Sequence, residues 1–182
     1  MWYAFVTTTA GNFSIQINPT WSPIGARHFL KLAQTGYYNG QKVFRVIPGF
    51  LAQFGYNGDP TVTKKTMATT IKDDPFRVSN RYGYVAFAGN AKDSRRTNVF
   101  INLADNFFID YRDPWATPFG RISKEGMQIV EKFYGEYSKL PDNEQPDQRS
   151  IAGFGNHYLE DKFPKLTEIV NIELVQYHHS EL

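Results

Sequence analysis

The stretch from Val43 to Gly55, V-F-R-V-I-P-G-F-L-A-Q-F-G, constrains the fold of this chain more than any other. Two apolar runs flank a Pro48-Gly49 break, a pattern typical of two short strands joined by a turn. Arg45 and Gln53 are the two polar side chains in it. Burying a cation and an amide in so apolar a run is costly unless each has a partner, which a ligand could supply. The two residues are therefore candidates for a binding site, against the alternative that Arg45 faces water at a sheet edge.

The composition indicates one β-rich domain. The 182 residues contain no internal repeat or low-complexity tract, so we expect a single domain spanning residues 1–182. Fifteen Phe and eleven Tyr favour β structure with aromatic packing over a helical bundle. A net charge of +2 gives no electrostatic footprint for nucleic acid, and we expect the Arg95-Arg96 cluster to lie in a solvated loop. With no cysteine, disulfides, thiolate catalysis and cysteine zinc sites are excluded.

No part of the sequence is typical of a membrane or targeting segment. No window approaches the roughly 18 apolar residues of a membrane span. Met1 leads directly into strand-like sequence, without the charged and apolar regions of a signal peptide. We expect a soluble monomer without a membrane partner, cytoplasmic or, if a signal peptide was removed, periplasmic or secreted.

Apolar periodicity predicts many short strands and few helices. Strands are expected at 2–9, 12–17, 83–88, 98–103 and 168–175 in addition to the pair within 43–55, and helices at 23–35 and 123–137. Residues 56–80, 107–119 and 139–155 are expected to be long loops, and contact of the segments 56–80 and 139–163 with a partner is left open. The predicted fold class is mainly β, a closed β-barrel capped by helices.

Familiar catalytic and metal-binding motifs are missing. There is no P-loop and no G-x-G-x-x-G after a strand, and no nucleophile has a nearby base. His157 and the His178-His179 pair lack suitably spaced partners, and Asp105, Asp110 and Asp113 do not fit a calcium loop, so we expect neither metal nor cofactor.

What remains is a candidate pocket with a few polar groups. Its apolar walls are Phe50, Leu51, Phe100 and Phe108, and its isolated polar groups are Arg45, Gln53 and Asn98. Such a set describes many small-ligand sites, although the same phenylalanines would also suit a barrel core.

Three blocks of the sequence resemble the cyclophilin family of peptidyl-prolyl isomerases. Residues 44–53, F-R-V-I-P-G-F-L-A-Q, resemble the family signature F-[HN]-R-[VI]-I-P-G-F-[ML]-x-Q. The second block is 83–88 followed by T-N-V-F-I at 97–101, and the third is F-G-R-I-S-K-E-G-M at 119–127. The resemblance extends over nearly the whole chain and implies a closed eight-stranded antiparallel barrel capped by two α-helices.

The resemblance implies site residues position by position. Arg45 matches the family's catalytic arginine, Gln53 its substrate-backbone glutamine, and Asn98 stands where glutamine is usual. Substrate-binding positions are implied for Phe50, Leu51, Phe100, Ile109, Ala88 and Gly89, the last of these where asparagine is usual.

Two departures affect the rim of the implied pocket. Phe108 occupies the usual tryptophan position and lacks the indole N–H, which puts binding of the cyclosporin class in doubt. The connection at 110–119 is longer than in the family and contains no histidine, so that Asp113 or Trp115 could fill that place.

The resemblance implies an isomerase that accelerates rotation about X–Pro bonds and assists folding. Its partners would be proline-containing peptides and unfolded or partly folded proteins. The alternatives are a non-catalytic proline-peptide binding module or chaperone on the same scaffold, and a barrel carrier for small apolar ligands.

Overall fold

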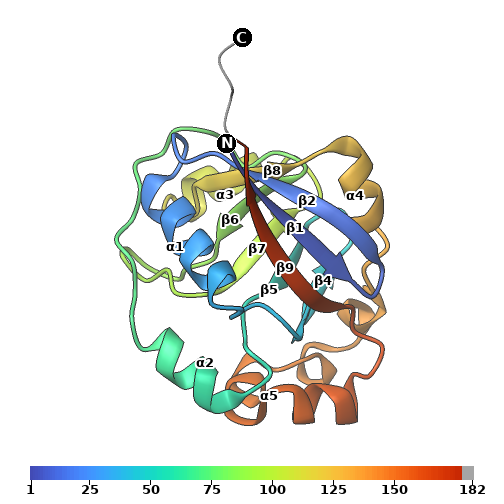
Figure 1. Ribbon diagram of the computed structural model, residues 1–182. Coiled ribbons are helices and arrows are strands. Elements are labelled where there is room, and N and C mark those ends of the chain that lie inside the picture. The colour runs from blue at the N-terminus through green and yellow to red at the C-terminus, as the bar shows by residue number, and fades with distance from the viewer. Residues whose placement is uncertain (178–182) are drawn as a thin grey trace.

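In the computed structural model, which describes residues 1–177, nine antiparallel strands form one strongly curled sheet, and helices lie around it (Figure 1). The strands are β1 Trp2–Thr8, β2 Gly11–Ile17, β3 Gln41–Lys42, β4 Arg45–Ile47, β5 Leu51–Phe54, β6 Tyr84–Phe87, β7 Val99–Asn102, β8 Pro118–Ile122 and β9 Glu168–Gln176. The helices are α1 Pro23–Gln34, α2 Pro60–Met67, α3 Phe107–Arg112, α4 Lys124–Val130 and α5 Gln148–Lys162, with 3₁₀ turns η1 Glu136–Lys139 and η2 Asp142–Glu144.

The sheet does not close into the expected eight-stranded barrel. The strand order is β3-β9-β1-β2-β8-β6-β7-β5-β4, so β3 and β4 are its two edges. Only Val43 and Phe44 separate these strands in the sequence, which brings the two edges near each other. Val43 donates its amide hydrogen to the Thr167 carbonyl at 2.8 Å, and Phe44 packs in a separate cluster. The chain therefore passes from one edge to the other without pairing them, and the result is a curled half-barrel.

The predicted hairpin and closing strand are confirmed. β1 pairs with β2 from Trp2 opposite Ile17 to Thr8 opposite Gly11, and β9 pairs with the other side of β1. Alternate residues of β2 (Phe13, Ile15 and Ile17) are buried in the large core cluster, as period-two alternation requires.

Residues 1–177 contain five α-helices where two were predicted. α1 agrees with the prediction, whereas α4 begins at its predicted cap, with Ser123 Oγ accepting the Gly126 amide at 3.1 Å, but ends at Val130. The loops predicted at 56–80 and 139–155 contain α2 and part of α5, and 107–119 contains α3. Among the described residues, none of the helices has the length and apolar character needed to cross a membrane.

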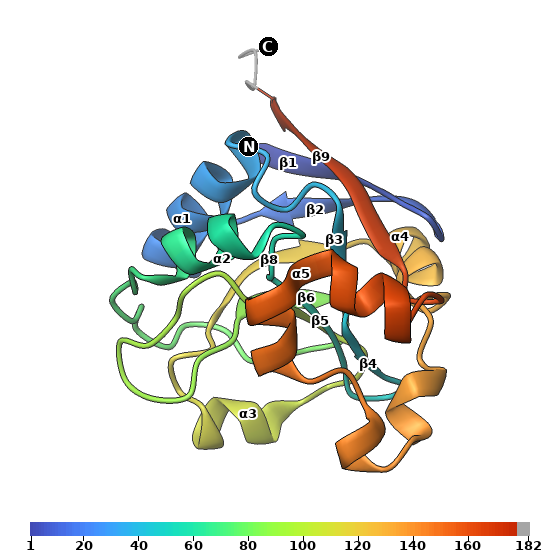
Figure 2. The same ribbon diagram turned by 90° about the horizontal axis from the view of Figure 1, so that it is seen from below.

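α2 and α5 form a second layer with its own core (Figure 2). Both helices carry Gly or polar residues on much of their surface, so their apolar periodicity is weak. The cluster they help to form contains Phe44, Tyr56, Ile151, Leu159, Phe163 and Leu166. α5 is kinked at Gly155, whose φ of 60° lies in the left-handed region, and a Cβ there would overlap the Gly58 carbonyl oxygen. This layer extends the fold beneath β4 and β5.

The prediction that Arg95 lies in a solvated loop is wrong. Its side chain is fully buried, with Nη2 3.1 Å from Asp74 Oδ2 and Nε 3.6 Å from Asp73 Oδ1. Asp74 also accepts hydrogen bonds from the amides of Ile24 and Gly25, both at 2.9 Å. The carboxylate of Asp74 therefore caps α1 from a distant part of the chain and neutralises Arg95.

Candidate active site

The two faces of β4, β5, β6 and β7 bury different side chains. In β5, Ala52 and Phe54 point into the large core, whereas Leu51 and Gln53 point to the opposite face. Opposed residues of antiparallel strands share a face, and Gln53 lies opposite both Arg45 and Phe100. A row of polar and apolar side chains therefore lies together on the outer face of the sheet.

A pocket of about 370 Å³ lies over this row. Its lining includes the predicted residues Arg45, Leu51, Gln53, Ala88, Gly89, Asn98, Phe100 and Ile109. The structure therefore brings together eight residues that are scattered along the sequence from Arg45 to Ile109.

Arg45 is half-buried at the edge of this pocket. Its Nη1 donates to Gln53 Oε1 at 3.3 Å, and its guanidinium carbon lies 5.9 Å from the centre of the Phe50 ring. Burial, and secondarily the positive charge of Arg112, lowers the pKa of Arg45 from its ordinary value. Arg45 nevertheless remains protonated at neutral pH, as arginines do. Because its side chain is half-buried, water solvates this cation only in part.

The apolar end of the pocket is formed by a separate small cluster. Its buried members are Leu51, Ala86, Phe100, Ile109 and Ala116, with Phe50, Ala88 and Trp115 packed against them. The cluster is independent of the large core, which lies on the other face of the sheet. These side chains are therefore not simply barrel core.

Phe50 and Phe108 lie beside the pocket rather than in its lining. The two rings stack on each other with centroids 5.6 Å apart, and the Phe108 side chain is 48% exposed. The guanidinium carbon of Arg112 lies 5.2 Å from the centre of the Phe108 ring. α3 turns Phe108 towards solvent and its neighbour Ile109 inwards, so a substrate contact of Phe108 stays a prediction.

Asp113 and Trp115 occupy different places at the rim. Asp113 lines the pocket and pairs with Arg112 at 2.7 Å. Trp115 packs against the apolar cluster and beside Gly89, with its indole nitrogen buried and unpartnered. A Cβ on Gly89 would come within 3.0 Å of Trp115 Cδ1 and 2.9 Å of Ser94 Oγ. The place of the Trp115 ring therefore requires a residue without a Cβ at position 89.

Replacing Gly89 with alanine is expected to destabilise the fold by about 1–2 kcal/mol, because the new methyl group must displace Trp115 or Ser94. Urea unfolding followed by tryptophan fluorescence measures this change. The cost of Gly89→Ala should be smaller when it is measured in a Trp115→Leu background than in the wild type, because one of the two clashing side chains is then shorter. An unchanged midpoint in the single variant would contradict the packing described for this pair.

A buried asparagine network behind the pocket was not predicted. Asn106 Nδ2 donates to the Phe50 carbonyl at 2.8 Å and to Asn102 Oδ1 at 2.9 Å. Asn102 in turn donates to Asn80 Oδ1 at 3.0 Å, and Asn80 donates to the Ala116 carbonyl at 2.9 Å. The network fixes the backbone on both sides of the apolar cluster. Its members are isolated polar residues at the ends of strands and loops, a weak signal in the sequence.

Eight further lining residues come from segments predicted as loops. They are Tyr56, Met67, Asn90, Ser94, Arg96, Arg112, Ala116 and Gln148. Met67 of α2 and Gln148 of α5 reach the pocket only through the second layer, for which the sequence offered no signal.

The carbonyl oxygen of the Asn98 side chain is buried in this pocket without a hydrogen-bond partner. An unsatisfied buried acceptor is costly, and a donor from a ligand would relieve that cost. No group of three or more potential ligand side chains able to hold a metal ion occurs among residues 1–177. His157 is exposed on α5, and His178 and His179 lie outside the described residues.

The curled sheet carries on its outer face a pocket that has an apolar end and a half-buried arginine in its lining. The sequence profile described as cyclophilin type peptidyl-prolyl cis-trans isomerase/CLD matches residues 3–153. The chain therefore belongs to the cyclophilin-type peptidyl-prolyl cis-trans isomerase family.

Individual relatives agree with this assignment. The chain is 31% identical over 149 residues to peptidyl-prolyl cis-trans isomerase A of Dickeya dadantii, covering 76% of this chain and 78% of the relative. It is 32% identical over 145 residues to a peptidyl-prolyl cis-trans isomerase of Acinetobacter baylyi, covering 74% and 76%.

A solved structure with the same fold is a Cryptosporidium parvum cyclophilin type peptidyl-prolyl cis-trans isomerase, crystallised in the presence of the dipeptide Ala-Pro. It superimposes with a TM-score of 0.66 over 96% of this chain and 99% of that chain, at 17% identity.

Proposed function

We propose that this pocket binds a proline-containing segment and accelerates rotation about its X–Pro bond. The observation that carries the proposal is the position of Arg45, a half-buried guanidinium in the lining of a pocket whose apolar end is a separate cluster. The cluster would hold the pyrrolidine ring, and Arg45 would lie beside the amide.

The reaction makes and breaks no bond, so the protein has only to stabilise the twisted amide. Resonance sets a barrier of about 18–20 kcal/mol to this rotation. An acceleration of roughly 10⁵-fold requires about 7 kcal/mol of preferential stabilisation of the transition state. The reaction itself therefore calls for no acid, base, metal or cofactor.

In this proposal Arg45 donates a hydrogen bond to the prolyl nitrogen, which becomes an acceptor once conjugation is lost. Such a bond exists only near the transition state, so it lowers the barrier instead of tightening ground-state binding. The side-chain oxygen of Gln53, Oε1, accepts a hydrogen bond from Arg45 Nη1 at 3.3 Å and so holds the guanidinium in place. A guanidinium positioned in this way loses little orientational freedom during the reaction.

Asn98 and Gln53 are proposed to hold the backbone next to the proline. The unpartnered Asn98 side-chain oxygen supports this role, because a peptide N–H would satisfy it. Leu51, Phe100 and Ile109 are proposed to hold the ring, with Ala88 and Gly89 alongside the bound chain. Fixing one side of the X–Pro bond leaves the other side to rotate.

A protease-coupled assay on a short neutral X–Pro peptide tests the proposal. The uncatalysed isomerisation takes tens of seconds. We expect the wild-type protein to raise the observed rate constant above the uncatalysed one by an amount proportional to the protein concentration. If the folded protein binds the peptide but leaves this rate unchanged, the protein is a proline-peptide binding module, and the proposal of catalysis is wrong.

A further inference from the structure

The pocket contains more positive than negative side chains. Arg45, Arg96 and Arg112 line it, against the single carboxylate of Asp113. Asp113 is already paired with Arg112 at 2.7 Å. Within residues 1–177, no carboxylate forms an ion pair with Arg45 or Arg96. Two cations that line the pocket therefore have no counter-charge from the described part of the chain.

Arg96 differs in this respect from its neighbour. Arg95 points into the protein, where Asp73 and Asp74 neutralise it. Arg96 instead lines the pocket and is partly exposed. An unpaired guanidinium facing a pocket can accept an anionic ligand without displacing an existing partner.

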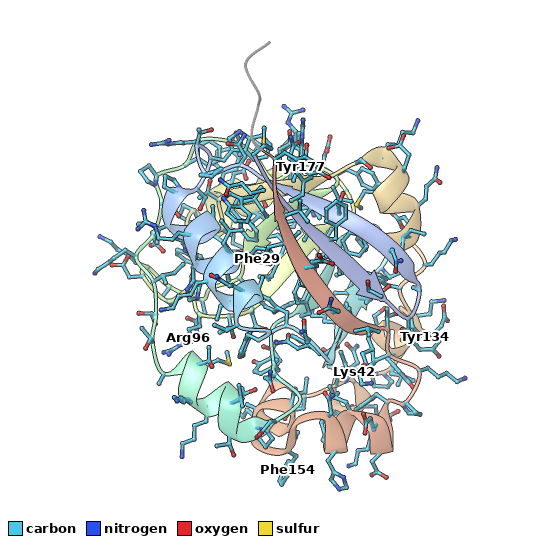
Figure 3. All side chains as sticks on the ribbon, in the orientation of Figure 1. Phe29, Lys42, Arg96, Tyr134, Phe154 and Tyr177 are labelled. Carbon is cyan, nitrogen blue, oxygen red and sulfur yellow. The ribbon has the colours of Figure 1, made fainter. Side chains whose placement is uncertain are left out.

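The position of Arg96 is fixed by its other contacts. Its Nη1 donates to the Met67 carbonyl at the end of α2, and Figure 3 shows the labelled side chain next to that helix. Its backbone carbonyl contacts His28 Nε2 at 2.5 Å. No other hydrogen bond from the Arg96 guanidinium is present among the described residues, so most of its five N–H donors remain available.

The pocket extends from α3 towards α2. Ile109 of α3 and Met67 of α2 both line it, and these helices lie apart in both Figure 1 and Figure 2. A peptide whose proline ring contacts Ile109 and Phe100 would therefore extend its neighbouring residues towards Met67 and Arg96. Side chains close to the proline in sequence would then be within reach of the unpaired guanidinium.

We propose that the pocket selects proline segments that carry an acidic side chain within two residues of the proline, with Arg96 as the specificity-determining residue. This inference rests on the proposed function. A carboxylate gains charge-assisted hydrogen bonds from Arg96, whereas a lysine at the same place meets like charge.

A peptide series tests the selectivity. The peptides are identical except for Glu, Gln or Lys at each of the two positions before and the two positions after the proline. At one position at least, we expect kcat/KM for the Glu peptide to exceed that for the Gln peptide by roughly fivefold, with the Lys peptide lowest. The ratio should fall when the salt concentration rises from about 20 mM to about 500 mM, because salt screens the pair.

Three variants assign the effect to Arg96. In Arg96→Gln the ratio of Glu to Gln peptides should fall to about one, and Arg96→Lys should keep part of it. Arg121→Gln removes the same charge from the exposed face of β8 and should keep the wild-type ratio. Each ratio is formed within one variant, so a change in overall activity does not affect it.

A wild-type ratio of one, a ratio that survives Arg96→Gln, or an equal fall in Arg121→Gln would overturn the proposal. If no peptide is turned over, the proposed function fails, and the ratio of Kd values for the same peptides then tests the selectivity by itself.

Discussion

Arg45→Lys is expected to reduce kcat/KM for X–Pro isomerisation by about 100-fold or more. A lysine keeps the charge but cannot reproduce the planar fork of Arg45, which contacts Gln53 and, in the proposed mechanism, would also donate to the prolyl nitrogen. Loss of one preorganised donor at a transition state commonly costs about 10²–10³-fold in rate. Protease-coupled kinetics of Arg45→Lys and Arg45→Ala measure the effect.

The matched control for this experiment is Arg121→Lys, on the outward side of β8, which should retain full activity. Because Arg45 is partly exposed, both substitutions at position 45 should leave the fold intact, as far-UV circular dichroism would show. Near-normal turnover in Arg45→Lys would refute the assignment of this residue.

Arg95→Met is expected to lower the free energy of unfolding by about 3–5 kcal/mol, because it leaves the buried carboxylate of Asp74 without its cation. Urea unfolding at neutral pH measures the change. Arg121→Met, as an exposed control, should change stability by less than about 0.5 kcal/mol. The double variant Arg95→Met, Asp74→Asn removes both charges and should recover part of the loss. A cost below about 1 kcal/mol for Arg95→Met would contradict the buried pair.

The lowered pKa of Asp74 makes the stability of the fold depend on pH. Burial raises the pKa of Asp74, but hydrogen bonds from Ser22, from the amides of Ile24 and Gly25, and from Arg95 outweigh it, so the pKa lies below its ordinary value. The folded state then binds this proton less readily than the unfolded state. The stabilisation is complete above about pH 4 and is lost as the pH falls through the folded-state pKa. Unfolding at pH 7 and pH 3 should show a smaller difference in Asp74→Asn than in the wild type.

The central strands could be predicted because their local pattern agrees with the sheet. The alternation in β2 and the Pro48-Gly49 break between β4 and β5 describe short-range geometry, and both strand pairs form as expected. Arg45 and Gln53 are eight residues apart and lie opposite each other across a hairpin, so a two-strand pattern is enough to bring them together.

The second layer could not be predicted in the same way. α5 contains two glycines and a kink, and its core is completed by Phe44 and Tyr56 from far earlier in the chain. Such a helix is stabilised by long-range packing and not by its own periodicity. The same reason explains why Met67 and Gln148 were not expected in the pocket.

Buried charges were the other source of error. Arg95 and Arg96 are adjacent and chemically identical, yet one is fully buried and the other lines the pocket. They differ because Asp73 and Asp74, over 20 residues earlier in the chain, form ion pairs with Arg95 and not with Arg96. The resemblance to the family supplied the roles of single residues, but the direction of Phe108 and the place of Asp113 depended on how α3 is formed.

The role of Arg45 is tested most directly by exchange NMR on a proline peptide whose cis and trans signals are resolved, recorded with substoichiometric wild-type protein and with Arg45→Ala. We expect strong cis–trans exchange peaks with the wild type, and binding shifts without exchange peaks with the variant. Equal exchange in the two samples would show that catalysis does not depend on Arg45, and the proposed mechanism would then be wrong.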